Sequence, residues 1–440
     1  MKVIIIGGGT LGTSCAFHLR KLNKKIDITI LEKTNNLDYS QCSLPYLISD
    51  EVVSEKEIFP FSKSDFKRNN IEIVLGSEVK NIDRSNKLVI TDSNKYSYDY
   101  VVLCTGSKQK FPNIKGVENT LSFNSIEDYH LLNQNLKNRK IKNISVIGSG
   151  LIGVELAVSL NKIGINVNLI ESEDYLLPSI IDSNLSKDVE KYLKSLGINL
   201  FFNSNVKEIK KDKVILDEKD LPSGLIFSCT GLKPNISLAK KIGLNVKRGI
   251  IVDDYLKTSD PNIFSGGDCA LTKNGINNEF EVSMLGTKAV RCAKTIAENI
   301  LSCDKKYNPF LNSTITKIGD KYLGAVGFNS RKSKIHGINP ISATFESKVS
   351  SEYFKSNDKI KYNMVANKSG KLIGCQVFSD VNVSGRINTI SVAIKNNMSV
   401  NSLSNVETCY NPGSAPIFDP MINTSEILSK KIRYLNKNGL

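Results

Sequence analysis

The sequence predicts an α/β protein made of two Rossmann-like dinucleotide-binding domains followed by a C-terminal α+β domain. Three observations support this prediction. A glycine-rich turn lies between a strand-like and a helix-like segment at residues 2–19, and the same arrangement recurs at residues 144–160. From about residue 313 the chain changes to alternating strands with glycine, without further nucleotide-binding signals.

The first glycine turn contains all the parts of a nucleotide site. Residues 2–6 form a β-branched run typical of a buried parallel strand, and residues 7–12 read Gly-Gly-Gly-Thr-Leu-Gly before an apolar-periodic helix. In this pattern the glycines allow a tight turn, a close pyrophosphate and close helix packing. The next strand, residues 26–31, ends in Glu32, which lies 32 − 12 = 20 residues after Gly12, where a carboxylate binds the ribose hydroxyls. This combination favours nucleotide binding over a fortuitous glycine turn.

The second glycine turn repeats the first. Residues 148–153 read Gly-Ser-Gly-Leu-Ile-Gly, a helix is expected at 154–160, and the strand at 166–170 ends in Glu171. A carboxylate there would accept both ribose hydroxyls of NADH and repel a 2′-phosphate, and no arginine directly follows it. NADH is therefore favoured over NADPH.

Composition limits the possible functions. The chain has 440 residues, 40% hydrophobic and 23% charged, as is usual for globular proteins. Its apolar runs are far shorter than the ~20 residues of a membrane span, and its first strand follows Met1 directly, which predicts a cytoplasmic protein. The net charge of +15 would suit anionic ligands or nucleic acid; the lysines are dispersed and no basic block with aromatics occurs, so we expect no nucleic-acid partner.

The nine cysteines are scattered, without CxxC pairs or histidines at metal spacing, so a reducing compartment and no metal site are expected. Cys42 stands apart because Pro45 fits the first turn of a short helix. Cys42 would then lie at a helix N-terminus, where the thiolate is favoured and can attack a disulfide, a peroxide or an oxidised flavin. The alternative is a buried structural cysteine.

These motifs resemble the pyridine nucleotide-disulfide oxidoreductases over nearly the whole chain. The resemblance rests on the two glycine turns with their carboxylates, on the Thr-Gly turns at 105–106 and 230–231, and on Gly267-Asp268. It implies FAD at the first site, NAD(P)H at the second and Asp268 on the ribityl chain. The implied FAD domain spans residues 1–112 and 245–312, with an NAD(P)H domain inserted at 113–244 and a dimerisation domain at 313–440.

The resemblance also implies a set of cofactor-binding residues. At the first site these are Gly7, Gly9, Thr10, Leu11, Gly12, Glu32, Lys33, Cys42, Val79, Thr105, Gly106, Asp268, Leu285, Gly286 and Thr287, and at the second they are Gly148, Gly150, Leu151, Ile152, Gly153, Glu171 and Gly231.

Within the family, the chain is similar to the branch with a single reactive cysteine. It lacks a CxxxxC pair and a C-terminal histidine, and Cys42 precedes Leu-Pro-Tyr, as in coenzyme A-disulfide reductases, NADH oxidases, NADH peroxidases and persulfide reductases. Oxidase and peroxidase members resemble one another in a histidine at the position of Thr10, which can act as an acid or base for peroxide. Because this chain has threonine at position 10, the resemblance favours the disulfide reductases over the oxidases and peroxidases.

Two tyrosines match positions that, in coenzyme A-disulfide reductases, reach the partner subunit's cysteine. They are Tyr353 and Tyr410, each of which could instead be an amphipathic core residue. Cys409 is either buried or a second thiol facing Cys42 across the dimer. Asp38 and Gln41 depart from the serine and asparagine usual before the cysteine, and an extra carboxylate beside the pocket would disfavour a pyrophosphate.

The expected function is that of a homodimeric, FAD-dependent NAD(P)H oxidoreductase. Its active site is shared between subunits, and it would reduce a low-molecular-weight disulfide or persulfide, such as that of coenzyme A, through Cys42. The alternatives are an NADH oxidase or peroxidase that uses a Cys42 sulfenic acid, and a flavin-bearing redox sensor or electron-transfer protein.

Overall fold

In the computed structural model the chain forms two compact units, and the structure describes residues 1–138 and 141–438. Unit 1 comprises residues 1–110 and 232–310, and unit 2 comprises residues 111–231 and the chain from 311 onward. Each unit is therefore assembled from two separate stretches of sequence.

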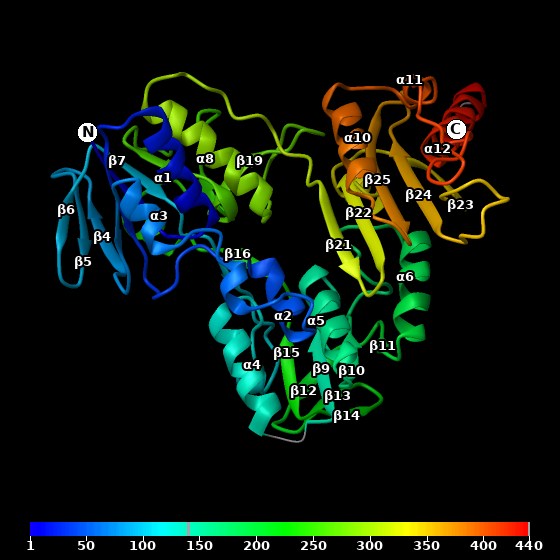
Figure 1. Cartoon of the computed structure of the whole chain (residues 1–440), viewed down its shortest axis with the longest axis horizontal. Helices are drawn as coiled ribbons and strands as arrows, with labels where there is room; N and C mark the ends of the chain where they lie inside the picture. Colours follow the sequence, from blue (N-terminus) through cyan, green and yellow to red (C-terminus); the bar gives the residue numbers. More distant parts are fainter. Residues whose placement is uncertain (139–140, 439–440) are drawn as a thin grey trace. The chain divides into compact units, whose positions relative to one another are not determined.

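A five-stranded parallel sheet forms the centre of unit 1, in the order β18-β7-β1-β2-β3. Its strands are β1 (Lys2–Ile6), β2 (Asp27–Leu31), β3 (Ile71–Val74), β7 (Tyr100–Leu103) and β18 (Ile263–Ser265). Helices α1 (Thr10–Leu22) and α8 (Gly286–Ile300) pack against each other beside this sheet (Figure 1). Both bury an apolar stripe at helical spacing, so the glycine turn before α1 is fixed by a continuous core.

Smaller elements complete unit 1. They are the antiparallel sheet β4 (Val79–Asp83), β5 (Leu88–Thr91) and β6 (Lys95–Ser97), the sheet β17 (Ile250–Ile251), β19 (Ala270–Lys273) and β20 (Phe280–Glu281), the pair β8 (Ser107–Gln109) and β16 (Leu232–Pro234), and the helices α2 (Leu44–Ile48), α3 (Lys63–Arg68) and α7 (Ser237–Lys241). The pairing of β8 with β16 brings together the segments that follow the two Thr-Gly turns.

Unit 2 contains a second parallel sheet, in the order β11-β10-β9-β15. Its strands are β9 (Asn143–Ile147), β10 (Asn166–Ile170), β11 (Asn199–Phe201) and β15 (Leu225–Ser228), with helices α4 (Ile126–Asn138), α5 (Leu151–Lys162) and α6 (Ser183–Ser195) and the antiparallel sheet β12 (Val206–Ile209), β13 (Lys213–Leu216) and β14 (Asp220–Pro222). Its glycine turn joins β9 to α5, as the first joins β1 to α1.

The C-terminal part of unit 2 is an antiparallel sheet in the order β21-β22-β25-β24-β23. It consists of β21 (Thr314–Ile318), β22 (Lys321–Gly327), β23 (Ile341–Lys348), β24 (Lys359–Ala366) and β25 (Leu372–Ser379), with helices α9 (Ser330–Ile335), α10 (Ser384–Lys395), α11 (Val400–Leu403) and α12 (Pro420–Lys437). Helix α12 contacts β23 and β24, and α10 contacts β22 and β25 (Figure 1). Every residue of the central strand β25 is buried.

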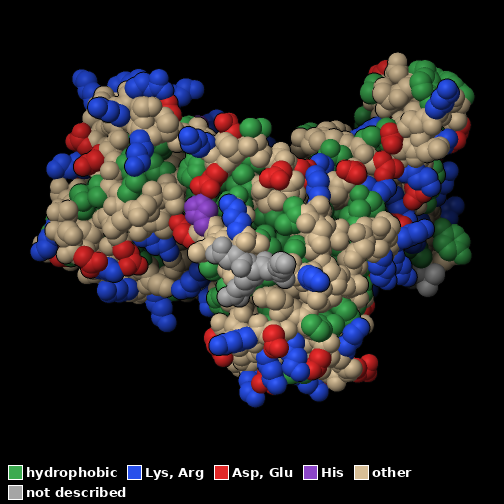
Figure 2. Space-filling view, turned by 60° about the horizontal axis from the view of Figure 1, so that its bottom comes forward, with side chains coloured by type: hydrophobic (Ala, Val, Ile, Leu, Met, Phe, Trp, Pro, Cys, Tyr) green, Lys and Arg blue, Asp and Glu red, His purple; other side chains and the backbone are tan. Residues whose placement is uncertain are grey.

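The α/β fold class is confirmed, with two repeated nucleotide-binding sheets and a C-terminal α+β part. The helix expected at 154–160 begins earlier, at Leu151, because Gly150 is its extended N-cap. No helix among residues 1–138 and 141–438 combines the length and apolar character that a membrane crossing requires. Figure 2 shows Lys and Arg side chains distributed over the visible face, with Asp and Glu among them.

A partly buried carboxyl in unit 2 should make stability depend on pH. The Thr316 hydroxyl of β21 donates to Glu155 of α5 at 2.5 Å, and burial raises the pKa of Glu155 from 4.5 to about 7. Between these values the native state keeps a proton that the unfolded state has lost, so the free energy of unfolding should fall as pH rises from 4.5 to about 7. Chemical unfolding at pH 5 and pH 8 measures this change, and the free energy of unfolding should fall by about 1–3 kcal/mol more in the wild type than in Glu155→Gln. An equal fall in the two proteins would contradict the assignment of the raised pKa to Glu155.

Candidate active site

The two glycine turns are held by close approaches that exclude side chains. Gly7 has φ +109°, and a Cβ there would lie 2.2 Å from the Cys104 carbonyl oxygen; a Cβ on Gly12 would lie 2.0 Å from the Gly7 carbonyl oxygen. In unit 2, Gly148 has φ +103°, and its Cβ would lie 2.5 Å from the Cys229 carbonyl oxygen. These glycines are required by the packing of the chain itself.

The middle glycine of each turn is different. Gly9 and Gly150 have φ of −79° and −67°, which any residue can adopt. A Cβ on either would meet nothing within 4 Å. The protein's own packing therefore gives no reason for glycine at these positions, whereas a pyrophosphate approaching the backbone does. The residues present thus fit dinucleotides at both turns.

The two predicted ribose carboxylates have matching environments. Glu32 accepts from the backbone N–H groups of Gly8 at 2.7 Å and Thr34 at 2.8 Å. Glu171 accepts from those of Ser149 at 2.9 Å and Glu173 at 3.0 Å. Burial acts to raise the pKa of Glu171, but hydrogen bonds from Ser149 and Glu173 outweigh it and lower the pKa, so the carboxylate is ionised at neutral pH.

Asp268 lies in a 3-10 turn, residues 267–269, that meets the first glycine turn. Its carboxylate accepts from the Ser107 hydroxyl at 3.0 Å, and burial raises its pKa. Gly267 packs beside the Leu11 side chain of α1. The Lys288 ammonium, 2% exposed, donates to the carbonyls of Gly267 at 2.9 Å and Ala270 at 3.1 Å and so holds this turn. Sequence reasoning missed Lys288, whose only signal is a lysine on the buried stripe of α8.

The other predicted residues are divided between the units. In unit 1, Leu285 is the N-cap of α8, Gly286 and Thr287 are exposed in its first turn, and the Thr105 hydroxyl donates to the Asn235 carbonyl at 2.6 Å. Lys33 is exposed and Val79 packs against the core, so their binding roles stay predictions, as does that of Gly106. Unit 2 holds the whole second set, with Leu151, Ile152 and Gly153 in the first turn of α5 and an exposed Gly231.

Cys42 is exposed, so the reading as a buried structural cysteine is wrong. It lies in the 3-10 turn Gln41–Ser43, directly before α2, which has Pro45 in its first turn. Ser43 is the N-cap of α2, so Cys42 lies directly before the N-cap of this short helix. The turn presents the sulfur at the surface of unit 1.

Asp38 ties the Cys42 segment to the first glycine turn. It is 8% exposed, and its two carboxylate oxygens accept from the hydroxyls of Thr10 at 2.8 Å and Thr13 at 2.9 Å. Burial raises the pKa of Asp38, and the two hydroxyls oppose that rise. The expectation that Asp38 is an extra charge facing the substrate pocket is therefore wrong, because both of its oxygens are used within unit 1.

Tyr353 and Tyr410 are brought together in unit 2. Their side chains are 74% and 53% exposed, so the alternative of a core residue is wrong for both. The Tyr410 hydroxyl donates to Tyr353, and this bond together with Ser351 lowers the pKa of Tyr353. The Ser351 N–H donates to the Pro412 carbonyl at 2.8 Å, which joins the two loops. Cys409, beside Tyr410, is exposed, so the expectation that it is buried is also wrong.

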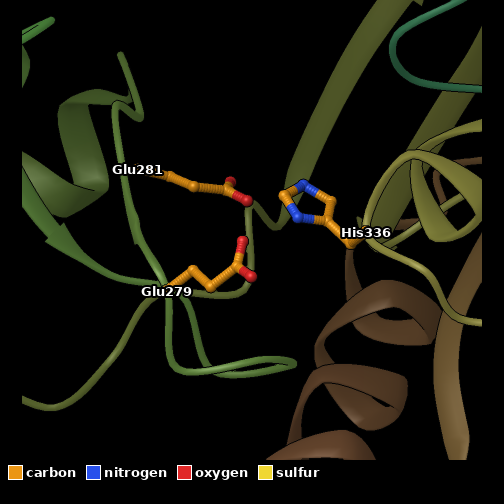
Figure 3. Close-up of side chains that lie close together, drawn as sticks. All are labelled: Glu279, Glu281 and His336. Carbon is orange, nitrogen blue, oxygen red and sulfur yellow. The ribbon is translucent and has the colours of Figure 1, made fainter.

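The expected absence of a metal site stays a prediction. Glu279 and Glu281 lie on the hairpin that leads into β20 in unit 1, with both carboxylates on the same side (Figure 3). His336 belongs to unit 2, where it follows α9 and its ring stacks on Phe328 at 5.0 Å. We propose no ligand set from either.

Comparisons with known proteins agree with this geometry. Residues 1–293 match the family model described as pyridine nucleotide-disulphide oxidoreductase. An NADH oxidase of Methanocaldococcus jannaschii is 32% identical, over 98% of this chain and 99% of its own. The chain belongs to this family.

Two further proteins that are similar to this chain are named as persulfide reductases. An NAD(P)H coenzyme A polysulfide/persulfide reductase of Pyrococcus horikoshii is 25% identical over 97% of this chain and 98% of its own length. The solved structure of an NAD-dependent persulfide reductase from A. fulgidus has a TM-score of 0.95 and 27% identity, covering 99% of this chain and 84% of that one. The protein is an FAD-dependent pyridine nucleotide oxidoreductase.

The middle and last glycines of the second turn should respond differently to alanine. Gly150→Ala should leave the thermal midpoint unchanged and weaken NADH binding by about tenfold, because the methyl group would occupy only the space left for the pyrophosphate. Gly153→Ala is the matched control. Its Cβ would lie 2.0 Å from the Gly148 carbonyl oxygen, so it should lower the thermal midpoint itself. Equal effects of the two variants on stability would contradict the distinction.

Removing the Asp38 carboxylate should loosen the Cys42 segment. Asp38→Ala leaves the Thr10 hydroxyl without its acceptor and the Thr13 hydroxyl with only the Gly9 carbonyl at 3.2 Å, at a local cost of about 1–3 kcal/mol. Hydrogen exchange should accelerate at residues 38–43, while Asp38→Asn, which keeps one acceptor oxygen, should show a smaller change. Unaltered exchange in Asp38→Ala would show that the segment is held by other contacts.

Proposed function

We propose that this protein is a homodimeric NADH-dependent reductase of a low-molecular-weight disulfide or persulfide of the coenzyme A type, acting through Cys42. The observation that carries the proposal is the exposed Cys42 sulfur, presented on a turn that Asp38 attaches to the first glycine turn. A cysteine in this place can exchange both with an external disulfide and with a cofactor bound at that turn.

The reaction at sulfur balances with one NADH per disulfide. The Cys42 thiolate attacks one sulfur of the substrate disulfide, whose S–S bond breaks, and one thiolate leaves while a mixed disulfide forms on Cys42. Two electrons and one proton then return the Cys42 thiolate and release the second thiol. FAD, when bound at the first turn, supplies the two-electron relay from NADH to this sulfur. The overall reaction converts one disulfide, one NADH and one proton into two thiols and NAD⁺.

The leaving thiolate needs a proton, and the tyrosine pair is suited to supply it. Tyr410 donates to Tyr353, and both are exposed on unit 2. A phenol can protonate a departing thiolate. The proposal takes this pair from a second copy of the chain, so that each active site contains Cys42 of one subunit and the tyrosines of the other.

The environment of Thr10 supports a disulfide rather than a peroxide. Its hydroxyl already donates to Asp38 and does not titrate near neutral pH, so this position offers no acid or base for breaking an O–O bond. Exchange with a disulfide needs no such group beside the flavin.

The proposed substrate is a disulfide or persulfide of a coenzyme A-type thiol. The proposed location is the cytoplasm, which keeps such thiols reduced.

A second candidate is an NADH oxidase, because the Methanocaldococcus jannaschii relative at 32% identity carries that name. In this alternative Cys42 cycles through a sulfenic acid formed by a reduced oxygen species. The two candidates predict different groups on the Cys42 sulfur, a thiol adduct for the reductase and a sulfenic acid for the oxidase.

The intact mass of the protein, isolated without reductant, separates the candidates. We expect a thiol adduct of the mass of coenzyme A on the wild type, lost in Cys42→Ser and retained in Cys303→Ser, which removes another exposed thiol of unit 1. Anaerobic NADH consumption with coenzyme A disulfide should disappear in Cys42→Ser and fall by about a hundredfold in Tyr410→Phe. An added oxygen at Cys42 would favour the oxidase, and an unmodified Cys42 in fully active enzyme would overturn both candidates.

A further inference from the structure

The segment that follows β10 is bound to the start of α9 by buried polar contacts within unit 2. Asn329, 3% exposed, donates to the carbonyls of Pro178 at 3.0 Å and Ile181 at 3.1 Å. Its side-chain oxygen also accepts from the Lys332 N–H at 2.8 Å and so caps α9. Residues separated by some 150 positions in the chain, 178–181 and 329, are thereby fixed against one another.

Asp182, which follows Ile181, makes further contacts with the start of α9. Its two carboxylate oxygens accept from the Ser330 N–H and the Ser330 hydroxyl, both at 2.8 Å, and from the fully buried Asn363 amide at 2.8 Å. At the other end of α9, the His336 ring, seen in Figure 3, stacks on Phe328. Helix α9 therefore has a defined position relative to the segment after β10.

This attachment places Arg331, in the first turn of α9, beside Glu173, which lies two residues after the predicted ribose carboxylate Glu171. The Arg331 guanidinium donates to Glu173 at 2.7 Å and is also hydrogen-bonded to Tyr175. The Glu173 N–H donates to Glu171 at 3.0 Å. Only the two-residue step from Glu171 to Glu173 separates the predicted ribose ligand from the carboxylate that holds the arginine. No arginine directly follows Glu171 in the sequence, and the arginine that does lie here comes from a distant part of the chain.

We infer that Arg331 and Glu173 together set the preference between NADH and NADPH. A guanidinium pairs with a phosphate through two parallel hydrogen bonds and is the group that accommodates a ribose 2′-phosphate in this type of site. Glu173 occupies Arg331 and adds a negative charge that repels the phosphate, so NADH is preferred while Glu173 is present. Removing the Glu173 charge should free Arg331 for the 2′-phosphate.

The ion pair is accessible to a ligand. The Arg331 and Glu173 side chains are each 42% exposed, and the pair keeps the pKa of Arg331 above its usual value, with Glu173 as the largest cause. A 2′-phosphate can therefore reach the guanidinium without rearrangement of the buried contacts of Asn329 and Asp182. The inference concerns nucleotide binding and does not depend on which disulfide the enzyme reduces.

Binding of two small nucleotides to the holoenzyme tests the inference without turnover. AMP and adenosine 2′,5′-bisphosphate differ only in the 2′-phosphate, and calorimetry gives both dissociation constants. Glu173→Gln should strengthen bisphosphate binding by about tenfold and leave AMP binding within about twofold. The double variant Glu173→Gln/Arg331→Ala should lose most of this gain, because only the part that comes from lost charge repulsion remains.

Two matched variants separate the ion pair from general charge effects. Asp174→Asn removes the same charge one residue further along, and Lys332→Ala removes a cation next to Arg331; neither should change the ratio of the two constants. Thermal midpoints and FAD content verify that each variant is folded. An undiminished gain without Arg331, an equal gain in Asp174→Asn, or no gain in folded Glu173→Gln would each overturn the inference.

Discussion

The close approach of a strand end to a glycine turn is the constraint on which the rest of the structure depends. The Cys104 carbonyl occupies the place of a side chain on Gly7, and the Cys229 carbonyl does the same at Gly148. Because these turns are fixed, the N–H groups that follow them are available to Glu32 and Glu171, and Gly9 and Gly150 leave open backbone for a pyrophosphate. The same physical arrangement thus occurs at both predicted nucleotide sites of the chain.

In unit 1 this constraint extends to the segment that carries Cys42. Helix α1 begins at the glycine turn, and two of its threonine hydroxyls hold Asp38, which begins the segment that carries Cys42. On the other side of the turn, Lys288 holds the carbonyls that flank Asp268. The first glycine turn, the Asp268 turn and the Cys42 segment are therefore joined by contacts within unit 1.

The sequence was sufficient for features that depend on local spacing and insufficient for those that depend on tertiary contact. Glycine spacing, strand runs and the terminal carboxylates predicted both nucleotide-binding sheets, because each motif is contained within about thirty residues. The roles of Asp38 and Lys288 were misjudged or missed, since burial and partners decide whether a charge faces a ligand or holds the backbone. Arg331 lies 158 positions from Glu173, and no local pattern connects them. The exposure of Cys409 and the pairing of Tyr353 with Tyr410 likewise depend on how two loops meet.

The central claim is that Cys42 is the site at which electrons from NADH reach an external acceptor. An anaerobic titration of the purified enzyme with NADH, followed by absorbance, tests it most directly. If Cys42 carries an oxidised sulfur, the wild type should consume about two equivalents of NADH per subunit and Cys42→Ser about one, since only the flavin remains to be reduced. Equal consumption by the two proteins would contradict the account.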